Sequence, residues 1–493
     1  MTITDKRATI DARRGIAAGL VAARTKAGRR AKRPSLISAT VTTPIPDPID
    51  LFVAARSLGY EGALWIQPDA ERALVGVGRA WAIDATGDAR FELAGAAWRA
   101  LLASAVTSGS PADVPEAGPI LLGGLGFTGH GPSAGDTWAP FGAASLVLPM
   151  FSAVRRGSWS GVTASAGPGG IDGLDATAME QRWDALVGAA TTAAAGRRAR
   201  GSASGQTSAT DPDELKVVGE RPDRAAWDRT VGLFAGAVGR GRIDKVVLAR
   251  RVALAAGAEL DIEAALRHLV RTAPESTTFA FGRGTTTFLG ATPERLVRTA
   301  GRSFETVAIA GSAPRGETAE GDARQAAGLL ASEKDREEHA VVVDMLRTSL
   351  RLIADRLAIA DAPSVLPLRH VQHLVTTVRG TLREDAGLLD VAGRLHPTPA
   401  VGGAPRDMAL ALIEEHETFD RGWYAGPIGW LGADGDGEMM VALRCGLVNG
   451  SQATLFAGCG IVGDSDPARE WDESRLKLRT MTAALGADPG GAQ

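Results

Sequence analysis

The order of strand and helix patterns in the second half of the chain constrains its fold more than any other feature. From Asp223 onward, segments with the period-two pattern of strands are mixed with segments of helical spacing. Strands are predicted at 245–254, 277–281, 286–290, 371–382, 426–431, 439–448 and 452–462, and helices at 227–240, 262–271, 323–357 and 467–485. Strands and helices do not alternate regularly, which argues against a simple doubly wound sheet.

The 493 residues exceed what one compact core usually holds, so two subdomains or one large globule are expected. Residues 1–34 are basic and poor in aromatic residues, and they are predicted to be a disordered, solvated tail. Strand-like patterns with Gly-rich connections occupy 35–190. Residues 191–215 have no periodicity and are predicted to be a flexible linker or loop, and 216–488 are predicted to form the second unit.

Composition excludes several classes of function. A net charge of -3 gives no electrostatic reason to expect nucleic acid or an anionic membrane as a partner. No apolar run is long enough to span a bilayer, and the N-terminus lacks the apolar stretch of a signal peptide. The two cysteines, Cys445 and Cys459, have no metal-ligand spacing, which disfavours a disulfide-stapled fold and a zinc site. The cytoplasm is the expected compartment.

Lys245 and Glu294 are the first pair that could carry acid–base chemistry. Lys245 lies on the small, apolar face of a predicted strand, where desolvation would lower its pKa and make it a usable base. A lysine at a strand end that reaches water remains an alternative. Glu294 follows Pro293 at a sharp turn, where it could protonate a leaving hydroxyl group or form a surface pair with Arg295.

Acidic residues on two predicted helices could form an all-oxygen site. Glu338, beside His339, shares a helical stripe with apolar residues and would need a cation or another partner if buried. Glu470, Glu473 and Lys477 lie on one face of the last helix. Together with Glu338 these glutamates would suit magnesium. The alternatives are a solvated Glu338 and an ordinary surface ion pair between Glu473 and Lys477.

Three Gly-rich segments at 308–312, 421–426 and 457–461 offer backbone N–H groups that could approach an anion. The middle one also carries the phenol of Tyr424. Downstream, Arg444 lies in the apolar strand predicted at 439–448, where a buried arginine would need a carboxylate partner. Each of these signals is weak alone.

Together and in this order, the segments from 223 to 485 resemble the chorismate-utilising enzymes, the family of anthranilate, aminodeoxychorismate, isochorismate and salicylate synthases. The resemblance implies an α/β (α+β) fold like that of anthranilate synthase component I, with an antiparallel β-sheet core surrounded by helices. Residues 35–190 would be the variable N-terminal half of this fold and 216–488 the catalytic, chorismate-binding domain. It implies chorismate as the small-molecule substrate and a monomer without an amidotransferase subunit.

The resemblance also assigns roles to individual residues. Glu338, Glu470 and Glu473 match the ligands of an Mg²⁺ ion that holds the ring carboxylate of chorismate. Cys459 stands where the family usually has a small apolar residue. The substrate-binding positions implied are Gly311, Ser312, His339, Tyr424, Arg444, Gly458, Cys459, Gly460 and Lys477, with 396–403 as a wall of the pocket.

Family members that use ammonia resemble one another in carrying glutamine where this chain has Lys245, and aminodeoxychorismate synthases carry lysine at the position of Ala310. This chain therefore resembles the water-using branch and is predicted to be an Mg-dependent isochorismate synthase. Lys245 would activate water for attack at C2, and Glu294 would protonate the hydroxyl group leaving C4.

Two other functions remain open. A salicylate synthase would add pyruvate elimination, although residues 396–401 resemble isochorismate synthases more closely. A non-catalytic relative would only bind chorismate. Residues 421–427 favour menaquinone biosynthesis over siderophore biosynthesis as the pathway.

Overall fold

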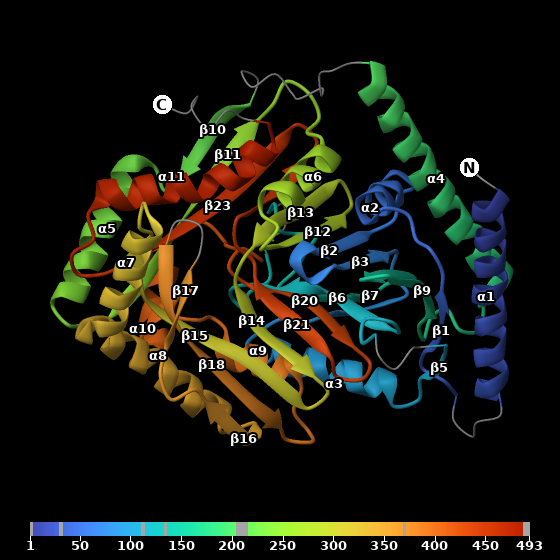
Figure 1. The fold of residues 1–493 in the computed structure, drawn as a ribbon, viewed down its shortest axis with the longest axis horizontal. Coiled ribbons are helices and arrows are strands. Elements are labelled where there is room, and N and C mark those ends of the chain that lie inside the picture. The colour runs from blue at the N-terminus through green and yellow to red at the C-terminus, as the bar shows by residue number, and fades with distance from the viewer. Residues whose placement is uncertain are drawn as a thin grey trace.

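The computed structural model describes residues 3–28, 33–109, 114–132, 136–203, 215–367 and 371–486. Two large sheets form its centre (Figure 1). The larger has 13 strands, in the order β10 (Lys216–Arg221), β11 (Lys245–Ala255), β23 (Gln452–Ile461), β22 (Cys445–Asn449), β13 (Thr286–Thr292), β12 (Thr277–Arg283), β2 (Gly62–Gln67), β3 (Arg72–Val77), β8 (Phe151–Arg156), β9 (Trp159–Ala166), β1 (Ile37–Thr42) and β5 (Val106–Ser108), with β19 (Gly403–Ala404) beside β11.

The smaller sheet has 10 strands, in the order β16 (Ala354–Ile359), β18 (Val371–Leu382), β15 (Ser303–Pro314), β14 (Arg295–Ala300), β21 (Gly437–Val441), β20 (Pro427–Gly432), β6 (Ile120–Leu125), β7 (Ala144–Leu148) and β4 (Trp81–Asp84), with β17 (Ser364–Pro367) beside β18. Among the described strands, every pairing is antiparallel except that of β1 with β5. The predicted antiparallel core is confirmed.

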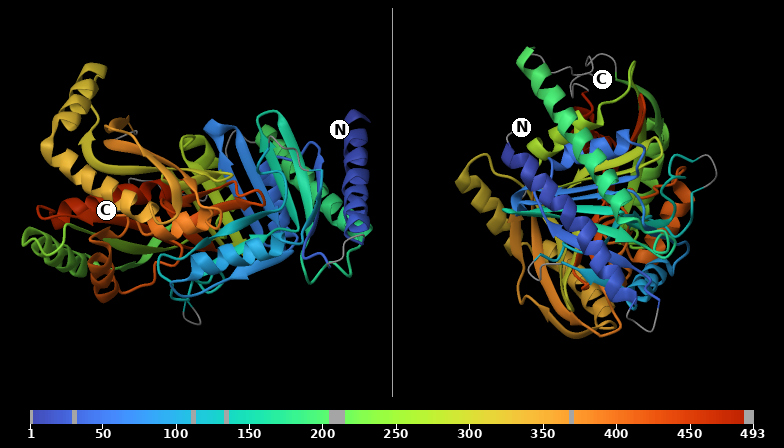
Figure 2. Two further views of the ribbon diagram at one scale, coloured as in Figure 1. Left: turned by 90° about the horizontal axis from the view of Figure 1, so that it is seen from below. Right: turned by 90° about the vertical axis from the view of Figure 1, so that its right-hand side faces the viewer.

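Helices surround the two sheets. They are α1 (Ile3–Gly28), α2 (Pro48–Ser57), α3 (Arg90–Leu102), α4 (Ala176–Ala203), α5 (Arg224–Gly239), α6 (Ile262–Thr272), α7 (Ala319–Ala331), α8 (Glu333–Leu350), α9 (Leu388–Leu395), α10 (Arg406–His416) and α11 (Pro467–Ala484), with a short 3-10 helix at Pro68–Ala70. Helices α7 and α8 stand at the end of the molecule opposite α1 (Figure 2). None of the helices described is both long and apolar enough to cross a membrane.

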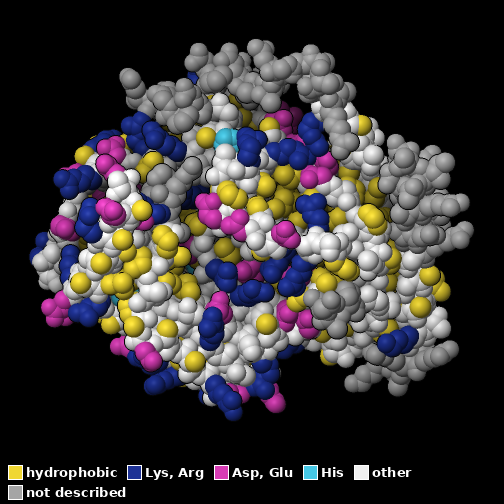
Figure 3. Space-filling model, in the orientation of Figure 1, with side chains coloured by type: hydrophobic (Ala, Val, Ile, Leu, Met, Phe, Trp, Pro, Cys, Tyr) yellow, Lys and Arg dark blue, Asp and Glu magenta, His cyan; other side chains and the backbone are white. Residues whose placement is uncertain are grey.

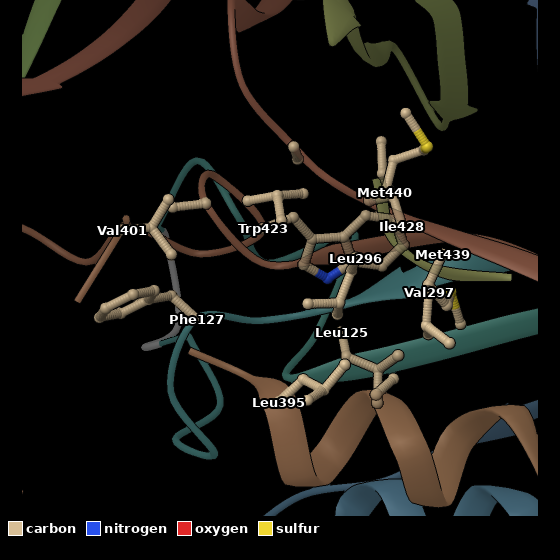
Figure 4. Packing of buried hydrophobic residues seen from close by; sticks show 14 of the residues in the cluster. Leu125, Phe127, Leu296, Val297, Leu395, Val401, Trp423, Ile428, Met439 and Met440 are labelled. Carbon is tan, nitrogen blue, oxygen red and sulfur yellow. The ribbon is translucent and has the colours of Figure 1, made fainter. Parts of the chain in front are cut away.

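Both sheets contain strands from the first and the second half of the chain, so the two halves form one large globule. One hydrophobic cluster has members from both sheets. In Figure 4, Trp423 lies among Leu125 of β6, Leu296 of β14, Ile428 of β20 and Met440 of β21. A second cluster packs the other side of the 13-stranded sheet against α1, α2, α4 and α6.

The N-terminal segment differs from the sequence prediction. Instead of a disordered tail, α1 packs along β1 and α4 (Figure 1). Ile16, Leu20, Ala23 and Ala27 recur at helical spacing and are buried. The prediction gave weight to the basic residues, but Arg24 and Lys26 are exposed and leave the apolar stripe free to pack.

Three other segments also differ from the prediction. The linker predicted at 191–215 begins inside α4, and its residues 204–214 lie outside the described part of the chain. The single helix predicted at 323–357 is divided at Ser332, whose side chain accepts a hydrogen bond from the Asp335 amide and so caps α8, and 354–359 form strand β16. The strand predicted at 439–448 is two strands, β21 and β22, which belong to different sheets.

Candidate active site

Lys245 begins β11 and is half-buried. It lies opposite Ala404 of β19 and close to Gly460 of the neighbouring strand β23. A Cβ atom at Gly460 would lie 2.4 Å from Cε of Lys245, which is far inside van der Waals contact. The glycine therefore leaves the space that the lysine side chain occupies.

The charges around Lys245 come from four different parts of the chain. Burial lowers the pKa of Lys245, and nearby Glu338 opposes this shift. Lys477 lowers the pKa further, whereas Glu294 and Glu473 raise it. The fold thus gathers charges from α8, α11 and the β13–β14 connection around one lysine of β11.

Glu294 lies between β13 and β14 and is half-buried. Its amide donates to Oγ1 of Thr292 at 3.3 Å, and its carbonyl accepts from the amide of Val441 at 2.9 Å, which fixes the turn. Burial raises the pKa of the Glu294 carboxyl group to about 7, while Lys245 acts in the opposite direction. Neighbouring Arg295 pairs with Glu438 at 3.1 Å, so the alternative of a surface pair between residues 294 and 295 is not found among the described contacts.

Three polar side chains of α11 lie on one face, as helical spacing predicted. Nζ of Lys477 is 2.7 Å from the Glu473 carboxylate and also donates to the carbonyl of Gly458 at 2.8 Å. The surface ion pair that was the alternative reading therefore exists, and the same lysine also contacts β23. Glu470 accepts a hydrogen bond from Ser465 at 2.7 Å.

The donor set around Glu470 fits a hard divalent cation. Ligand atoms of Cys459, Glu470 and Glu473 lie within 4.8 Å of one another. Burial raises the pKa of Glu470, and the adjacent Glu473 raises it too, so a cation between the two carboxylates would relieve both effects. Burial also raises the pKa of the Cys459 thiol to about 12, and the thiol donates to the Glu470 carbonyl at 3.2 Å, which leaves the carboxylate oxygens as the donors.

Glu338 is placed differently from its predicted position. Among the described residues, the group within 4.8 Å contains Glu470 and Glu473 but not Glu338. The sequence argument put Glu338 on the buried stripe of its helix, but the buried residues of α8 are His339, Leu346 and Leu350, and Glu338 is exposed. That argument was wrong because the packed face is rotated by one residue. Glu338 nevertheless lies near enough to Lys245 to raise its pKa.

His339 uses both of its ring nitrogens inside the protein. Nδ1 lies 3.2 Å from the carbonyl of Ala310, and Nε2 lies 2.7 Å from the hydroxyl group of Thr376. Burial lowers the pKa of this imidazole. These contacts fasten α8 to β15 and β18, so the structure supports a positioning role for His339; its predicted substrate contact stays a prediction.

Gly311 interrupts the ladder between β15 and β18 with a bulge and adopts a left-handed φ of 76°. The bulge sets Ser312 beside His373, whose Nδ1 is 2.8 Å from the serine hydroxyl group. Burial lowers the pKa of His373, and the charges of Lys245 and Lys477 lower it further. The sequence analysis did not single out His373, although the register of β18 against 308–312 would have pointed to it.

Tyr424 is buried and stacks on Phe456, with ring centroids 5.3 Å apart. A Cβ atom at Gly458 would lie 2.9 Å from the phenolic oxygen of Tyr424, so a side chain there would displace the ring. Gly458 and Gly460 thus serve the packing of Tyr424 and Lys245, which the sequence analysis did not foresee.

Arg444 was expected within a strand, buried and paired with a carboxylate. It is exposed instead and lies in the turn between β21 and β22, with a left-handed φ of 47°. Among the described residues it forms no ion pair within 4 Å. The expectation was wrong because the apolar run continues through a turn, and the guanidinium group is therefore available to an anionic ligand.

The segment 396–403 forms a wall beside Glu294. A narrow cavity of about 30 Å³ separates this wall from the Glu294 turn and α8. The buried hydroxyl group of Thr398 lines it and has no hydrogen-bond partner among the described residues. Sequence reasoning treated the segment as a whole and did not identify Thr398 as a polar group facing the site.

A chorismate binding enzyme family model matches residues 22–486. The salicylate biosynthesis isochorismate synthase of Pseudomonas aeruginosa is 39% identical over 93% of this chain and 92% of its own length. The isochorismate synthase MenF of Bacillus subtilis is 32% identical over 90% of this chain and 92% of its length.

Solved structures agree with these sequence relatives. The alignment with the structure of the menaquinone-specific isochorismate synthase MenF of Escherichia coli covers 95% of this chain and 100% of the MenF chain, with a TM-score of 0.72 at 24% identity. Anthranilate synthase component I of Streptococcus pneumoniae covers 84% of this chain and 92% of its own, with a TM-score of 0.65 at 21% identity. At these identities the likeness establishes the fold, and the predicted resemblance to anthranilate synthase component I is confirmed.

Proposed function

The chain belongs to the chorismate-binding enzyme family, and we propose that within this family it is an isochorismate synthase, an isomerase that moves a hydroxyl group from C4 to C2 of the chorismate ring. One observation carries the proposal beyond family membership. Lys245 and Glu294 couple electrostatically within one site, and their pKa values are shifted toward each other, the lysine downward and the glutamic acid up to about 7. A neutral amine and a protonated carboxyl group are the pair that this reaction needs.

Lys245 is the base in this proposal. In its neutral form it accepts a proton from water, and the resulting hydroxide bonds to C2 of the ring. The ring double bonds shift, and the bond from C4 to its hydroxyl group breaks. Glu294 gives its proton to the departing oxygen, which leaves as water, so one water is consumed and one is released. Transfer of the proton from Lys245 back to Glu294 restores the starting state.

The site residues suit a substrate with two carboxylates. We propose that Glu470 and Glu473 hold Mg²⁺ and that Glu338, which among the described residues lies outside their group but close to Lys245, is the third ligand. When bound, the ion would neutralise and orient the ring carboxylate. Gly311, Ser312 and His373 would border the ring, and Arg444 would pair with the second carboxylate beside Tyr424. Arg444 supports this role, because its exposed guanidinium group forms no ion pair within 4 Å among the described residues and can make a bidentate bond.

The decisive experiment incubates the purified protein with chorismate and Mg²⁺ and identifies the products by liquid chromatography with mass detection. An isomer of unchanged mass that disappears in a Lys245→Ala variant is expected. Salicylate and pyruvate, formed faster than isochorismate decays alone, would instead favour a salicylate synthase. Unchanged chorismate with folded protein would leave a binding role and contradict both enzyme functions.

For the pathway we propose menaquinone biosynthesis, supported by the form of 421–427. A relative named for salicylate biosynthesis makes the siderophore branch the alternative. Deleting the gene and measuring menaquinone and catechol or salicylate siderophores in the same cells distinguishes the two: loss of menaquinone alone is expected.

We also propose that the protein acts in the cytoplasm as a monomer and needs no amidotransferase subunit. Water as the nucleophile removes the need for a subunit that supplies ammonia. The face drawn in Figure 3 mixes acidic, basic and hydrophobic side chains. Light scattering of the active protein, together with cell fractionation, tests the monomer and the compartment.

A further inference from the structure

Helix α11 carries Glu470 and Glu473 on one side and is held to the sheet by a different side. Its buried residues include Trp471 and Ser474, each directly after one of these glutamates. Successive residues of an α-helix point about 100° apart. Any rotation of α11 about its axis therefore moves the packed side chains and the carboxylates together.

Arg250 of β11 contacts the packed side of α11 through Trp471 and Ser474. Its guanidinium carbon lies 3.4 Å from the centre of the Trp471 ring, so the two groups are stacked. One terminal nitrogen donates to the Ser474 hydroxyl group at 2.9 Å, and this hydroxyl group donates to the Trp471 carbonyl at 2.6 Å. The other donates to Glu220 of β10 at 2.6 Å.

The directional contacts of Arg250, rather than the surface area that it buries, specify the rotation of α11. The side chain is only 1% exposed, and burying a guanidinium group is costly unless its bonds are well made. An aliphatic residue would fill the same space, but it would not specify the rotation of the helix. With carboxylates roughly 6 Å from the helix axis, a rotation of about 10° shifts them by about 1 Å. Metal sites tolerate deviations of only about 0.2 Å.

We propose that Arg250 is a positioning residue that fixes the rotation of α11 and thereby sets the Glu470 and Glu473 carboxylates for a divalent cation. The inference rests on the proposed function insofar as that cation serves chorismate turnover. Trp227 assists at the start of the helix, where its indole N–H donates to the Pro467 carbonyl at 3.2 Å. That bond fixes the end of α11, whereas Arg250 fixes the face that α11 presents.

The test compares Arg250→Met, Arg250→Lys and Ser474→Ala with Arg90→Met as the matched control. Arg90 of α3 is likewise a buried arginine stacked on an aromatic ring, 4.8 Å from the Phe91 centroid, and it donates to a backbone carbonyl. Mn²⁺ affinity is measured by electron paramagnetic resonance without chorismate, and half-saturating Mg²⁺ is measured in turnover. Melting temperatures are recorded for all variants.

Arg250→Met is expected to weaken Mn²⁺ binding and to raise half-saturating Mg²⁺ about tenfold, the lower end for groups that orient metal ligands. Ser474→Ala should lower the Mn²⁺ affinity about threefold, because it removes the hydrogen bond from Arg250 to the Ser474 hydroxyl group. The Mn²⁺ affinity of Arg250→Lys should lie between those of Ser474→Ala and Arg250→Met. Arg90→Met should lower the melting temperature without changing Mn²⁺ affinity.

Unchanged Mn²⁺ affinity in Arg250→Met would overturn the proposal and leave Arg250 a purely structural residue. If that variant does not fold, unchanged affinity in both Arg250→Lys and Ser474→Ala overturns it equally. A wild-type protein that binds no Mn²⁺ also overturns it. A wild-type protein that binds Mn²⁺ but leaves chorismate unchanged contradicts only the proposed function.

Discussion

At the scale of single residues, the proposed chemistry depends on two side chains whose surroundings oppose their ordinary charge states. Glu294 lies where burial raises its pKa from 4.5 to about 7, and Lys245 lies where burial lowers its pKa. Neither shift can be read from the neighbouring residues in sequence, since the charges that act on Lys245 and Glu294 lie on elements remote in sequence. The same surroundings make Glu294 a cost to stability once it is charged.

Replacing Glu294 with glutamine should therefore stabilise the folded protein in alkaline solution. Because the pKa of Glu294 is raised in the folded state, the stabilising contribution of its protonated carboxyl group to the free energy of unfolding is complete below pH 4.5. This contribution is lost as the pH rises through about 7. At pH 8 we expect Glu294→Gln to be about 2 kcal/mol more stable in urea unfolding than the wild type, and the gap should close toward pH 4.5. Activity should fall at least a hundredfold. A constant stability difference across this pH range would contradict the buried, neutral acid.

Gly460 gives a second prediction at this scale. Gly460→Ala places a methyl group 2.4 Å from the present position of Lys245 Cε. The flexible lysine can move aside, so the melting temperature should change little while turnover falls about a hundredfold through the misplaced base. Gly219→Ala in β10, whose nearest neighbour would be 4.0 Å away, is the control and should leave both unchanged. Full activity of Gly460→Ala would remove the packing argument for this glycine.

At the scale of elements, α1 is the clearest case of packing that outweighs local composition. Leu20 is 1% exposed, whereas its neighbour Val21 is 56% exposed. Leu20→Ala should destabilise the protein by about 2–4 kcal/mol because it leaves a cavity against β1, with an unchanged KM for chorismate. Val21→Ala should have almost no effect. Equal, negligible effects of both changes in denaturant titrations would mean that α1 is not packed in solution.

Helix α8 shows why an element can be predicted while the orientation of its faces is not. The cap at Ser332 and the apolar spacing define a helix. However, apolar residues occupy two adjacent faces of this helix, and the sequence does not reveal which of the two faces the sheet. A shift of one residue exchanges Met345 for Leu346 in the core and moves Glu338 to the exposed side. Contact with β15 and β18 decides which of the two faces of α8 is buried.

At the scale of the whole molecule, a buried ionic network joins the two sheets close to the site. Glu438 of β21 accepts from Gln67 of β2 at 2.7 Å, lies 3.6 Å from Arg72 of β3, and pairs with Arg295 beside Glu294. Arg72 also lies 2.9 Å from buried Glu116. The network thus ties both sheets to the turn that carries the proposed acid.

Removing Glu438 should loosen this connection. We expect Glu438→Ala to cost about 3–5 kcal/mol of unfolding free energy, because it leaves a buried arginine with one partner fewer. The variant should also raise KM, since Arg295 no longer holds the Glu294 turn. Glu305→Ala, at the half-buried second partner of Arg295, is the control and should cost less than about 1 kcal/mol. A loss no larger than that of the control would show that the sheets are held by apolar packing alone.

Much of this protein follows from its sequence alone. Periodicity predicted β11, β12, β13, β18, β20 and β23, together with α11 and, as part of one longer helix, α8, because alternation and helical spacing record burial locally. It did not predict β10, β14, β15, β16, β17 or β19. The order of the motifs identified the family, and Lys245 identified the water-using branch. The gathering of Lys245, Glu294, Glu473 and Lys477 in one site was implied only by the resemblance to the family, because motifs read one by one along the chain do not say which of them meet in space.

The tertiary structure decided what depends on distant partners. It made α1 part of the core, brought β21 and β22 into different sheets with Arg444 exposed between them, and placed His373 and Thr398 beside the site. It also brought Arg250 into stacking contact with Trp471 of α11. In each case the deciding contact joins residues remote in sequence, so local patterns carry no record of it. Which face is buried and which charge is desolvated are properties of the packed molecule.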